Sequence, residues 1–96
     1  MQKRAVVINL KDNVATAVAD LSAGSQVSFF LGQDVEQLTL NNHIPLGHKF
    51  ALKDINRGEE IIKYGESIGS SIISIQKGDH VHVHNIQSNR GRGDRG

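Results

Sequence analysis

The chain has 96 residues, of which 38% are hydrophobic and 22% charged, and its formal net charge is +1. This length fits one domain with a single modest core, and the small net charge argues against steering toward nucleic acid or an anionic membrane. The chain has no cysteine, which excludes a disulfide framework, a thiolate nucleophile and a cysteine zinc site. No apolar run approaches the roughly 20 residues of a transmembrane helix, so we expect a cytoplasmic protein that binds neither nucleic acid nor membrane.

The core must be built mainly from aliphatic side chains, because the chain has no Trp, one Tyr and three Phe. Small domains of this kind are often marginal on their own, and association buries more of their apolar surface. We therefore expect a partner chain, with self-association into a homo-oligomer as an alternative.

The first predicted elements are a strand and a short helix. Residues 5–10 are nearly continuous in apolarity, which predicts a strand. Asp12 suits a helix N-cap and Gly24 a helix stop, so we predict one helix over residues 12–22. The apolar face of this helix would hold Val14, Ala17, Val18 and Leu21.

Strand signals dominate the rest of the chain. The expected strands span residues 26–31, 35–40, 48–55, 60–64, 68–75 and 80–84. Gly69 interrupts one of them and predicts a kink or bulge. No internal repeat of useful period is evident. We expect one mainly β domain over residues 1–87, followed by a flexible Arg/Gly tail over residues 88–96, which has no apolar residue.

Two groups of residues carry side chains suited to catalysis. His48 and Lys49 follow the Pro45–Gly47 turn, where an imidazole can move protons and an ammonium can bind a carboxylate. The alternative is a pair of solvated loop residues. His80, His82 and His84 alternate along a predicted strand, so they would share one face about 7 Å apart, with the intervening valines toward the core. They would bind a metal or act on a substrate, unless the strand is simply half exposed and polar.

Two further segments favour a plainer interpretation. Lys63, Tyr64 and Gly65 offer groups that bind carboxylate or phosphate, although a turn and a bulge are the more common explanation. The Arg/Gly tail is similar to RNA-binding segments, but it is short and lacks interleaved aromatic residues.

Taken together, these segments resemble the N-terminal SAF domain of the altronate/galactarate dehydratase family. The resemblance runs from about residue 5 to residue 95. The motifs that carry it are Asp-Asn-Val-Ala-Thr-Ala at 12–17, Ile-Pro-Leu-Gly-His-Lys at 44–49, Lys-Tyr-Gly at 63–65 with Ile-Gly at 68–69, and Val-His-Val-His-Asn at 81–85. Family members occur as one long chain or as separate small and large subunits, and this chain resembles a small subunit.

The resemblance implies a β-clip fold and lyase chemistry. The expected function is that of the small subunit of a sugar-acid dehydratase, an altronate dehydratase-like hydro-lyase that is active only with its large subunit on a small hydroxy acid. The small subunit of a sulfolactate sulfo-lyase is one alternative, and a non-catalytic ligand-binding or assembly module is another. A divalent metal is also implied, with Fe(II) expected ahead of manganese or magnesium and bound largely by the partner subunit.

The resemblance also implies roles for individual residues. The residues that match its motifs are His48, Lys49, His82 and His84 as catalytic groups and Lys63, Tyr64 and Asn85 as substrate-binding groups. His82 and His84 are the candidate metal ligands. His80 falls outside the matching pattern and receives no role.

Overall fold

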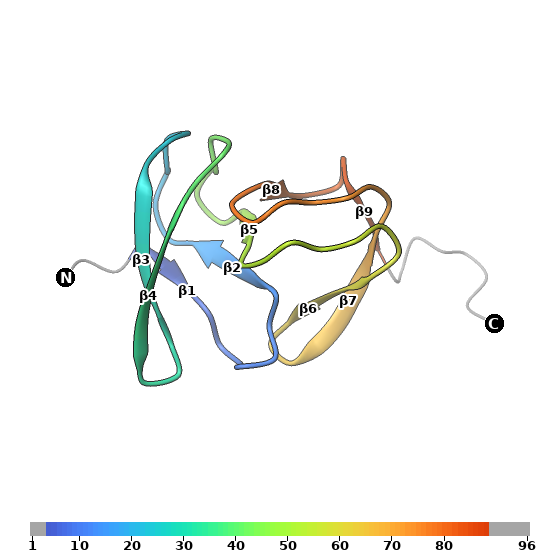
Figure 1. Cartoon of the computed structure of the whole chain (residues 1–96), viewed down its shortest axis with the longest axis horizontal. Coiled ribbons are helices and arrows are strands. Elements are labelled where there is room, and N and C mark those ends of the chain that lie inside the picture. The colour runs from blue at the N-terminus through green and yellow to red at the C-terminus, as the bar shows by residue number, and fades with distance from the viewer. Residues whose placement is uncertain (1–3, 89–96) are drawn as a thin grey trace.

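A computed structural model describes residues 4–88 (Figure 1). Within this range the chain forms nine strands and no helix: β1 Ala5–Val6, β2 Val14–Ala17, β3 Gln26–Leu31, β4 Asp34–Thr39, β5 Lys49–Ala51, β6 Glu60–Lys63, β7 Glu66–Ser71, β8 His80–Val81 and β9 Ile86–Ser88. The expectation of a mainly β fold is confirmed. No helix in the described range is long and apolar enough to cross a membrane. The predicted tail lies outside these residues, apart from Ser88.

The strands form three antiparallel sheets that follow one another along the molecule. A four-stranded sheet with the order β1-β2-β5-β8 occupies the centre. The β3–β4 hairpin stands at one end of the view, and the β6-β7-β9 sheet stands at the other (Figure 1). The central sheet therefore has neighbours on both sides, and β5 and β8 are its last two strands.

The predicted helix over residues 12–22 is wrong, because this segment contains strand β2. Val14, Ala15 and Ala17 are all buried, so β2 is covered on both faces and its apolar residues do not alternate. A short apolar run of this kind fits a buried strand as well as one side of a helix. Asp12 does not cap a helix either. Its carboxylate accepts a hydrogen bond of 2.8 Å from the backbone N–H of Gly65, far away in the sequence.

Four turns share one sequence pattern, which the expectation of no internal repeat overlooked. Each has a buried aliphatic residue, glycine three positions later, and a buried apolar residue three positions after that: Leu21, Gly24 and Val27; Ile44, Gly47 and Phe50; Ile55, Gly58 and Ile61; and Ile75, Gly78 and Val81. Every one of these glycines has a φ between 83° and 91°. This conformation suits the third position of a type II turn, which strongly favours glycine.

The four turns are joined in pairs. Leu21 and Ile44 exchange two backbone hydrogen bonds, and Ile55 and Ile75 do the same. The turns recur at unequal intervals along the chain, so a search for a fixed period misses them. Strand β5 follows the second turn and strand β8 follows the fourth, so these two turns set where the two paired strands begin.

Two hydrophobic clusters meet at the central sheet. One surrounds the edge-to-face contact between Phe29 and Phe50, whose ring centroids are 6.3 Å apart. The other contains Ile55, Ile61 and Val81. Strand β5 contributes to both clusters, because Phe50 packs into the first and Ala51 into the second. This packing fixes the strand that follows His48.

The outer sheet contains the irregularity that Gly69 predicts. The pairing of β6 with β7 shifts register between Ile61 and Ile62, where Ile61 faces Gly69 and Ile62 faces Ser67. A Cβ atom at position 69 would collide with the backbone carbonyl of Gln87 in β9. Gly69 therefore allows the close approach of two strands beside a bulge, in agreement with the prediction.

Asn13 connects the central and outer sheets. Its side-chain amide donates to the carbonyl of Glu60 at 2.9 Å and accepts from the N–H of Ile62 at 2.8 Å. Asn13 is 5% exposed, so water cannot readily replace these bonds. The side chain thus fixes β6 against the segment that leads into β2.

We predict that Asn13→Ala lowers the free energy of unfolding by roughly 1–3 kcal/mol, because the carbonyl of Glu60 and the N–H of Ile62 lose their partner in a part-buried contact. Urea denaturation measures this change as a lower midpoint at unchanged slope. The matched control is Asn56→Ala at an exposed position, which should leave the midpoint almost unchanged. Equal midpoints for the two variants would contradict the connecting role of Asn13.

Candidate functional site

The pairing of β5 with β8 brings two distant histidine-bearing segments together. Lys49 lies opposite Val81, and Phe50 lies opposite His80. His48 directly precedes β5, and His82 directly follows β8. Since the strands run antiparallel, these two histidines lie at the same end of the short ladder.

The strand predicted over residues 80–84 ends at Val81, and the chain then turns. The N–H of Asn85 donates to the carbonyl of His82 at 3.0 Å. Val81 is buried as predicted, whereas Val83 is 78% exposed, so its predicted position toward the core is wrong. Strict alternation fails here because the turn at residues 82–85 replaces the second half of the expected strand.

Three histidines nevertheless form a close cluster, which we call the histidine cluster: His48, His80 and His82. His48 Nδ1 lies 2.9 Å from His80 Nε2, which is hydrogen-bonding distance. The ring of His48 stacks on that of His82, with centroids 4.1 Å apart and planes 18° apart. The rings of His80 and His82 are 5.6 Å apart and nearly parallel. Each ring therefore contacts or faces the other two.

His84 lies at the edge of this cluster. Its ring centroid is 5.1 Å from that of His80, with a tilt of 37° between the planes. The family pattern sets His80 aside and favours His84, yet it is His80 that hydrogen-bonds to His48. The alternation of His80, His82 and His84 already groups His80 with the other two in the sequence, and it is the family pattern that leaves His80 out.

Asn85 holds the backbone of the histidine cluster. Its side chain accepts from the N–H of His82 at 2.9 Å and donates to the carbonyl of His80 at 2.7 Å. Asn42 adds a third bond, accepting from the N–H of His80 at 2.9 Å. Asn85 is 3% exposed, and its amide is engaged with the chain itself. The substrate-binding role expected for Asn85 stays a prediction beside this observed positioning role.

The histidine cluster disfavours positive charge. The pKa of His80 is lowered to about 4, first by burial away from water and then by the neighbouring His84, His48, His82 and His43. Burial also lowers the pKa of His82, followed by the effect of His48. Unprotonated imidazoles can accept protons or coordinate metals near neutral pH.

Lys49 brings an amine to the edge of the cluster. Burial lowers its pKa, and the ammonium of Lys63 lowers it further. Lys49 in turn contributes to the lowered pKa of His82, which places the two side chains in one electrostatic environment. An anion bound here would relieve the repulsion between these groups.

Lys63 and Tyr64 belong to a different part of the surface. Tyr64 and Gly65 both have positive φ, 58° and 78°, as the two-residue turn between β6 and β7 requires. The Lys63 ammonium lies 4.9 Å from the centre of the Tyr64 ring, and Tyr64 is 55% exposed. The β6–β7 turn lies at the lower edge of the view, whereas β8 lies near the top (Figure 1). The electrostatic effect of Lys63 on Lys49 is the observed link between the two groups.

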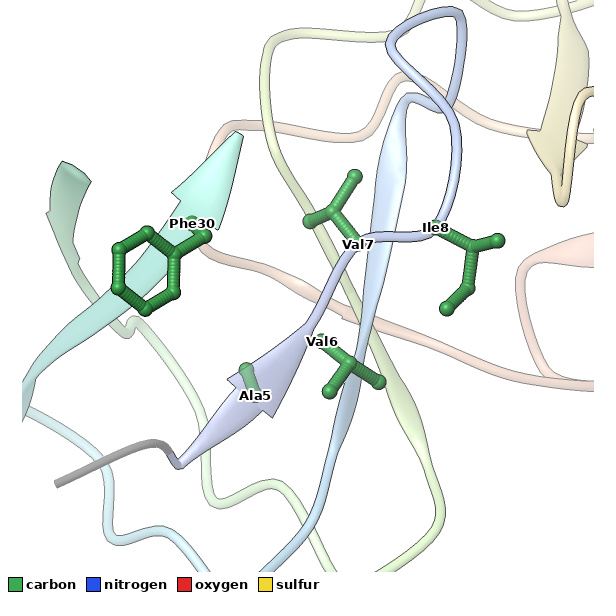
Figure 2. A pocket seen from close by; sticks show the side chains of 5 residues that line it. All are labelled: Ala5, Val6, Val7, Ile8 and Phe30. Atoms are coloured by element: carbon green, nitrogen blue, oxygen red, sulfur yellow. The ribbon is translucent and has the colours of Figure 1, made fainter. Parts of the chain in front are cut away.

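The chain also has an apolar pocket of about 110 Å³ away from the histidines. Figure 2 shows its lining, which consists of Ala5, Val6, Val7, Ile8 and Phe30. The pocket lies between β1 and β3 and has no titratable side chain in its lining. It therefore offers hydrophobic contact but no acid–base chemistry.

The donor set limits which metals this chain could hold. His48, His80 and His82 each offer one nitrogen, and these three atoms lie within 4.8 Å of one another. Imidazole nitrogen suits zinc, iron, copper and nickel, whereas magnesium prefers oxygen ligands. The residues therefore fit the expected Fe(II) and not magnesium. The metal-ligand role expected for His82 and His84 stays a prediction; His82 belongs to this group of three nitrogens, and His84 does not.

We predict that the stability of the metal-free chain decreases as the pH falls from about 6.5 toward 4. The unfolded state binds a proton at His80 near the ordinary pKa of 6.5, whereas the folded state does so only near 4. The stability that the folded state has while His80 is unprotonated is thus fully present above pH 6.5. It is lost as the pH falls from 6.5 to about 4. His80→Gln should flatten this part of the stability profile, measured by urea denaturation with EDTA present. A His80 ring signal that titrates at or above pH 6.5 by NMR would contradict the prediction.

Comparison with known proteins places the sequence of this chain in a family. The model of the altronate/galactarate dehydratase SAF domain matches residues 3–89. Altronate dehydratase of Escherichia coli (strain K12) is 45% identical over 84 residues, which are 88% of this chain and 16% of that enzyme. Galactarate dehydratase (L-threo-forming) of the same organism is 43% identical over 72 residues, 73% of this chain and 12% of that enzyme. This chain thus spans a small fraction of either dehydratase.

A different relative has nearly the same extent as the matched region. The (2R)-sulfolactate sulfo-lyase subunit alpha of Chromohalobacter salexigens is 38% identical over 88 residues, which are 88% of this chain and 94% of that subunit. The family match covers both pairs of turns, the histidine cluster and Lys49. The chain belongs to the altronate/galactarate dehydratase SAF domain family.

Proposed function

We propose that this chain is the small component of a hydroxy-acid lyase and completes its active site together with a larger chain. The observation that carries this proposal is the gathering of His48, Lys49, His80 and His82 at the end of the β5–β8 ladder. The relatives of this chain include dehydratases and a sulfo-lyase, so elimination from a hydroxy acid is the chemistry they have in common.

The proposed division of labour between two chains rests on the surroundings of this cluster. Apolar side chains are exposed close to it, with Val83 at 78% in the turn that carries His82. Ile72 and Ile73 are 42% and 49% exposed, and the N–H of Ile72 binds the carbonyl of Asn85 in the same turn. Exposed apolar groups beside polar ones are typical of a surface that another protein covers. A larger chain docked here would enclose the histidines and exclude water.

The proposed reaction begins with removal of the proton next to the substrate carboxylate. An unprotonated imidazole is suited to accept this proton, and the lowered pKa values of His80 and His82 keep their rings unprotonated near neutral pH. The His48–His80 hydrogen bond gives the accepted proton a path between two rings. Any of the three rings is close enough to the others to serve as base or as acid.

The carbanion that follows proton removal is an enediolate, which requires positive charge nearby. Lys49 is suited to bind the carboxylate, since an anion there relieves its repulsion from Lys63. A divalent metal, when bound, would supply further stabilisation of the enediolate oxygens. The leaving group on the β carbon then departs, and a protonated imidazole assists if that group is hydroxide.

A sugar-acid dehydratase and a sulfo-lyase differ in the group that leaves in this last step, which is hydroxide in the first and sulfite in the second. One observation favours each of them. The 45% identity to altronate dehydratase of Escherichia coli exceeds the 38% identity to the sulfo-lyase subunit alpha of Chromohalobacter salexigens, which favours the dehydratase. The match to that subunit alpha covers 94% of its length, which favours an assembly of separate chains. We propose the dehydratase as the first function and the sulfo-lyase as the second.

We predict that Lys49→Met lowers kcat/KM of the reconstituted complex by at least about 100-fold, because the substrate carboxylate loses its cation. The 96-residue chain is mixed with the large partner, and turnover is compared with that of Lys53→Met, an exposed lysine two positions beyond β5. The control should turn over like the unmodified complex. If Lys49→Met were equally active, the chain would be a binding or assembly module and not part of the active site.

The product decides between the two lyases. We predict that the complex releases a 2-keto acid from a sugar acid such as altronate or galactarate without forming sulfite. Sulfite release from sulfolactate, measured with a thiol-reactive dye, would instead support the second function. Activity of the small chain alone on either substrate would contradict the division between two chains.

A further inference from the structure

We propose that His48, His80 and His82 form a transition-metal site held by this chain alone, with one coordination position open to a ligand from outside. The three donor nitrogens come from two segments that are distant in sequence, one leading into β5 and one containing β8, yet they lie within 4.8 Å of one another. This inference concerns the 96-residue chain itself and does not depend on the lyase proposal. A ring nitrogen that binds a metal has no lone pair left to accept a proton, so the acid–base role proposed above applies to the metal-free cluster.

The backbone of the site is fixed by hydrogen bonds within the chain. The β5–β8 register holds His80 opposite Phe50 and places His48, which directly precedes β5, beside the same short ladder. Asn85 binds the backbone of both His80 and His82, and Asn42 binds the N–H of His80. Coordination therefore requires side-chain rotation only, and little conformational entropy is lost on binding.

The required side-chain movement is small. Two nitrogens bound to zinc at about 2.1 Å in tetrahedral geometry lie about 3.4 Å apart. His48 Nδ1 and His80 Nε2 are already 2.9 Å apart, so they would separate slightly. All three nitrogens lie within 4.8 Å of one another, so no separation would have to shrink by more than about 1.4 Å. Rotation of an imidazole about its χ angles covers such a distance.

The protonation of the rings also suits coordination. One proton lies between His48 Nδ1 and His80 Nε2 when they are hydrogen-bonded. For both atoms to bind a metal, the donor ring must carry its proton on its other nitrogen, which is a change of tautomer with no net gain or loss of protons. A divalent ion would replace this hydrogen bond with two coordinate bonds.

The number of ligands indicates the type of site. Structural zinc sites are closed by four protein ligands, whereas catalytic sites have three and leave the fourth position to water or substrate. His84 lies near His80 but outside the group of converging donors. His43 is engaged with Asp20 at 2.8 Å. The site thus has the three-ligand composition of a metal centre that meets a substrate or a partner's side chain.

The test is direct binding of Co²⁺ and Zn²⁺ to the full chain after treatment with EDTA. We expect one equivalent of Co²⁺ to bind with a Kd of about 10 µM or tighter and to produce visible d–d absorption, which Zn²⁺ then abolishes. His80→Ala and His82→Ala should each weaken binding by at least about 100-fold. The matched controls His84→Ala and His43→Ala should bind within about threefold of the unmodified chain.

Several results would overturn the proposal. One is the absence of saturable binding by the unmodified chain up to about 1 mM metal. Another is binding by His80→Ala and His82→Ala that equals that of the controls. A third is an equal loss of metal affinity in all four variants, which would indicate weak, unspecific binding of the metal by surface histidines. Amide NMR spectra establish that each variant is folded, and His48→Gln replaces any variant that is not.

Discussion

The short ladder between β5 and β8 is the interaction on which the candidate site depends. Lys49 pairs with Val81 and Phe50 with His80, and the site residues directly precede, form or follow these two pairs. Phe50 and Val81 are completely buried, one in each hydrophobic cluster, so the packing of the two clusters fixes the register of the ladder. A slip of one residue would move these apolar side chains out of the core and separate His48 from His82. Core packing and site geometry are therefore set by the same register.

A glycine turn precedes each of the two strands of this ladder and determines where the strand begins. Gly47 and Gly78 occupy the same position in two copies of one turn, and each is followed within two residues by a histidine, His48 and His80. Their positive φ values, 86° and 91°, are strained for other residues. The same turn thus occurs four times in residues 4–88, and two of its copies also position the histidines His48 and His80.

Much of the fold can be predicted from the sequence, and the failures have physical causes. The strand expected over residues 26–31 agrees with Gln26–Leu31, because one face is buried and the pattern alternates. The helix expected over residues 12–22 is wrong, because Val14–Ala17 is buried on both faces and tertiary pairing overrides local periodicity. The turn at 82–85 does have a local signal, since an Asn side chain bound to the N–H three residues earlier stabilises a turn.

The sequence predicts that histidines form the candidate site, but it does not predict which of them come together. His48 and His82 are expected to act together, and their rings stack. The alternation along residues 80–84 groups His80 with His82, but His80 reaches His48 only through the β5–β8 register, which pairs residues roughly 30 positions apart and cannot be read from the local sequence. Asn85 contacts the backbone of the cluster, which the sequence does not predict, and its expected contact with substrate stays a prediction.

The central claim is that the histidine cluster faces a substrate and a second chain. The most direct measurement is the NMR spectrum of the imidazole rings as the large chain and a hydroxy acid are added to the small one. The account predicts that the ring signals of His48, His80 and His82 shift together, while that of His43, held by Asp20, stays in place. Formation of the complex with the three ring signals unchanged would contradict it.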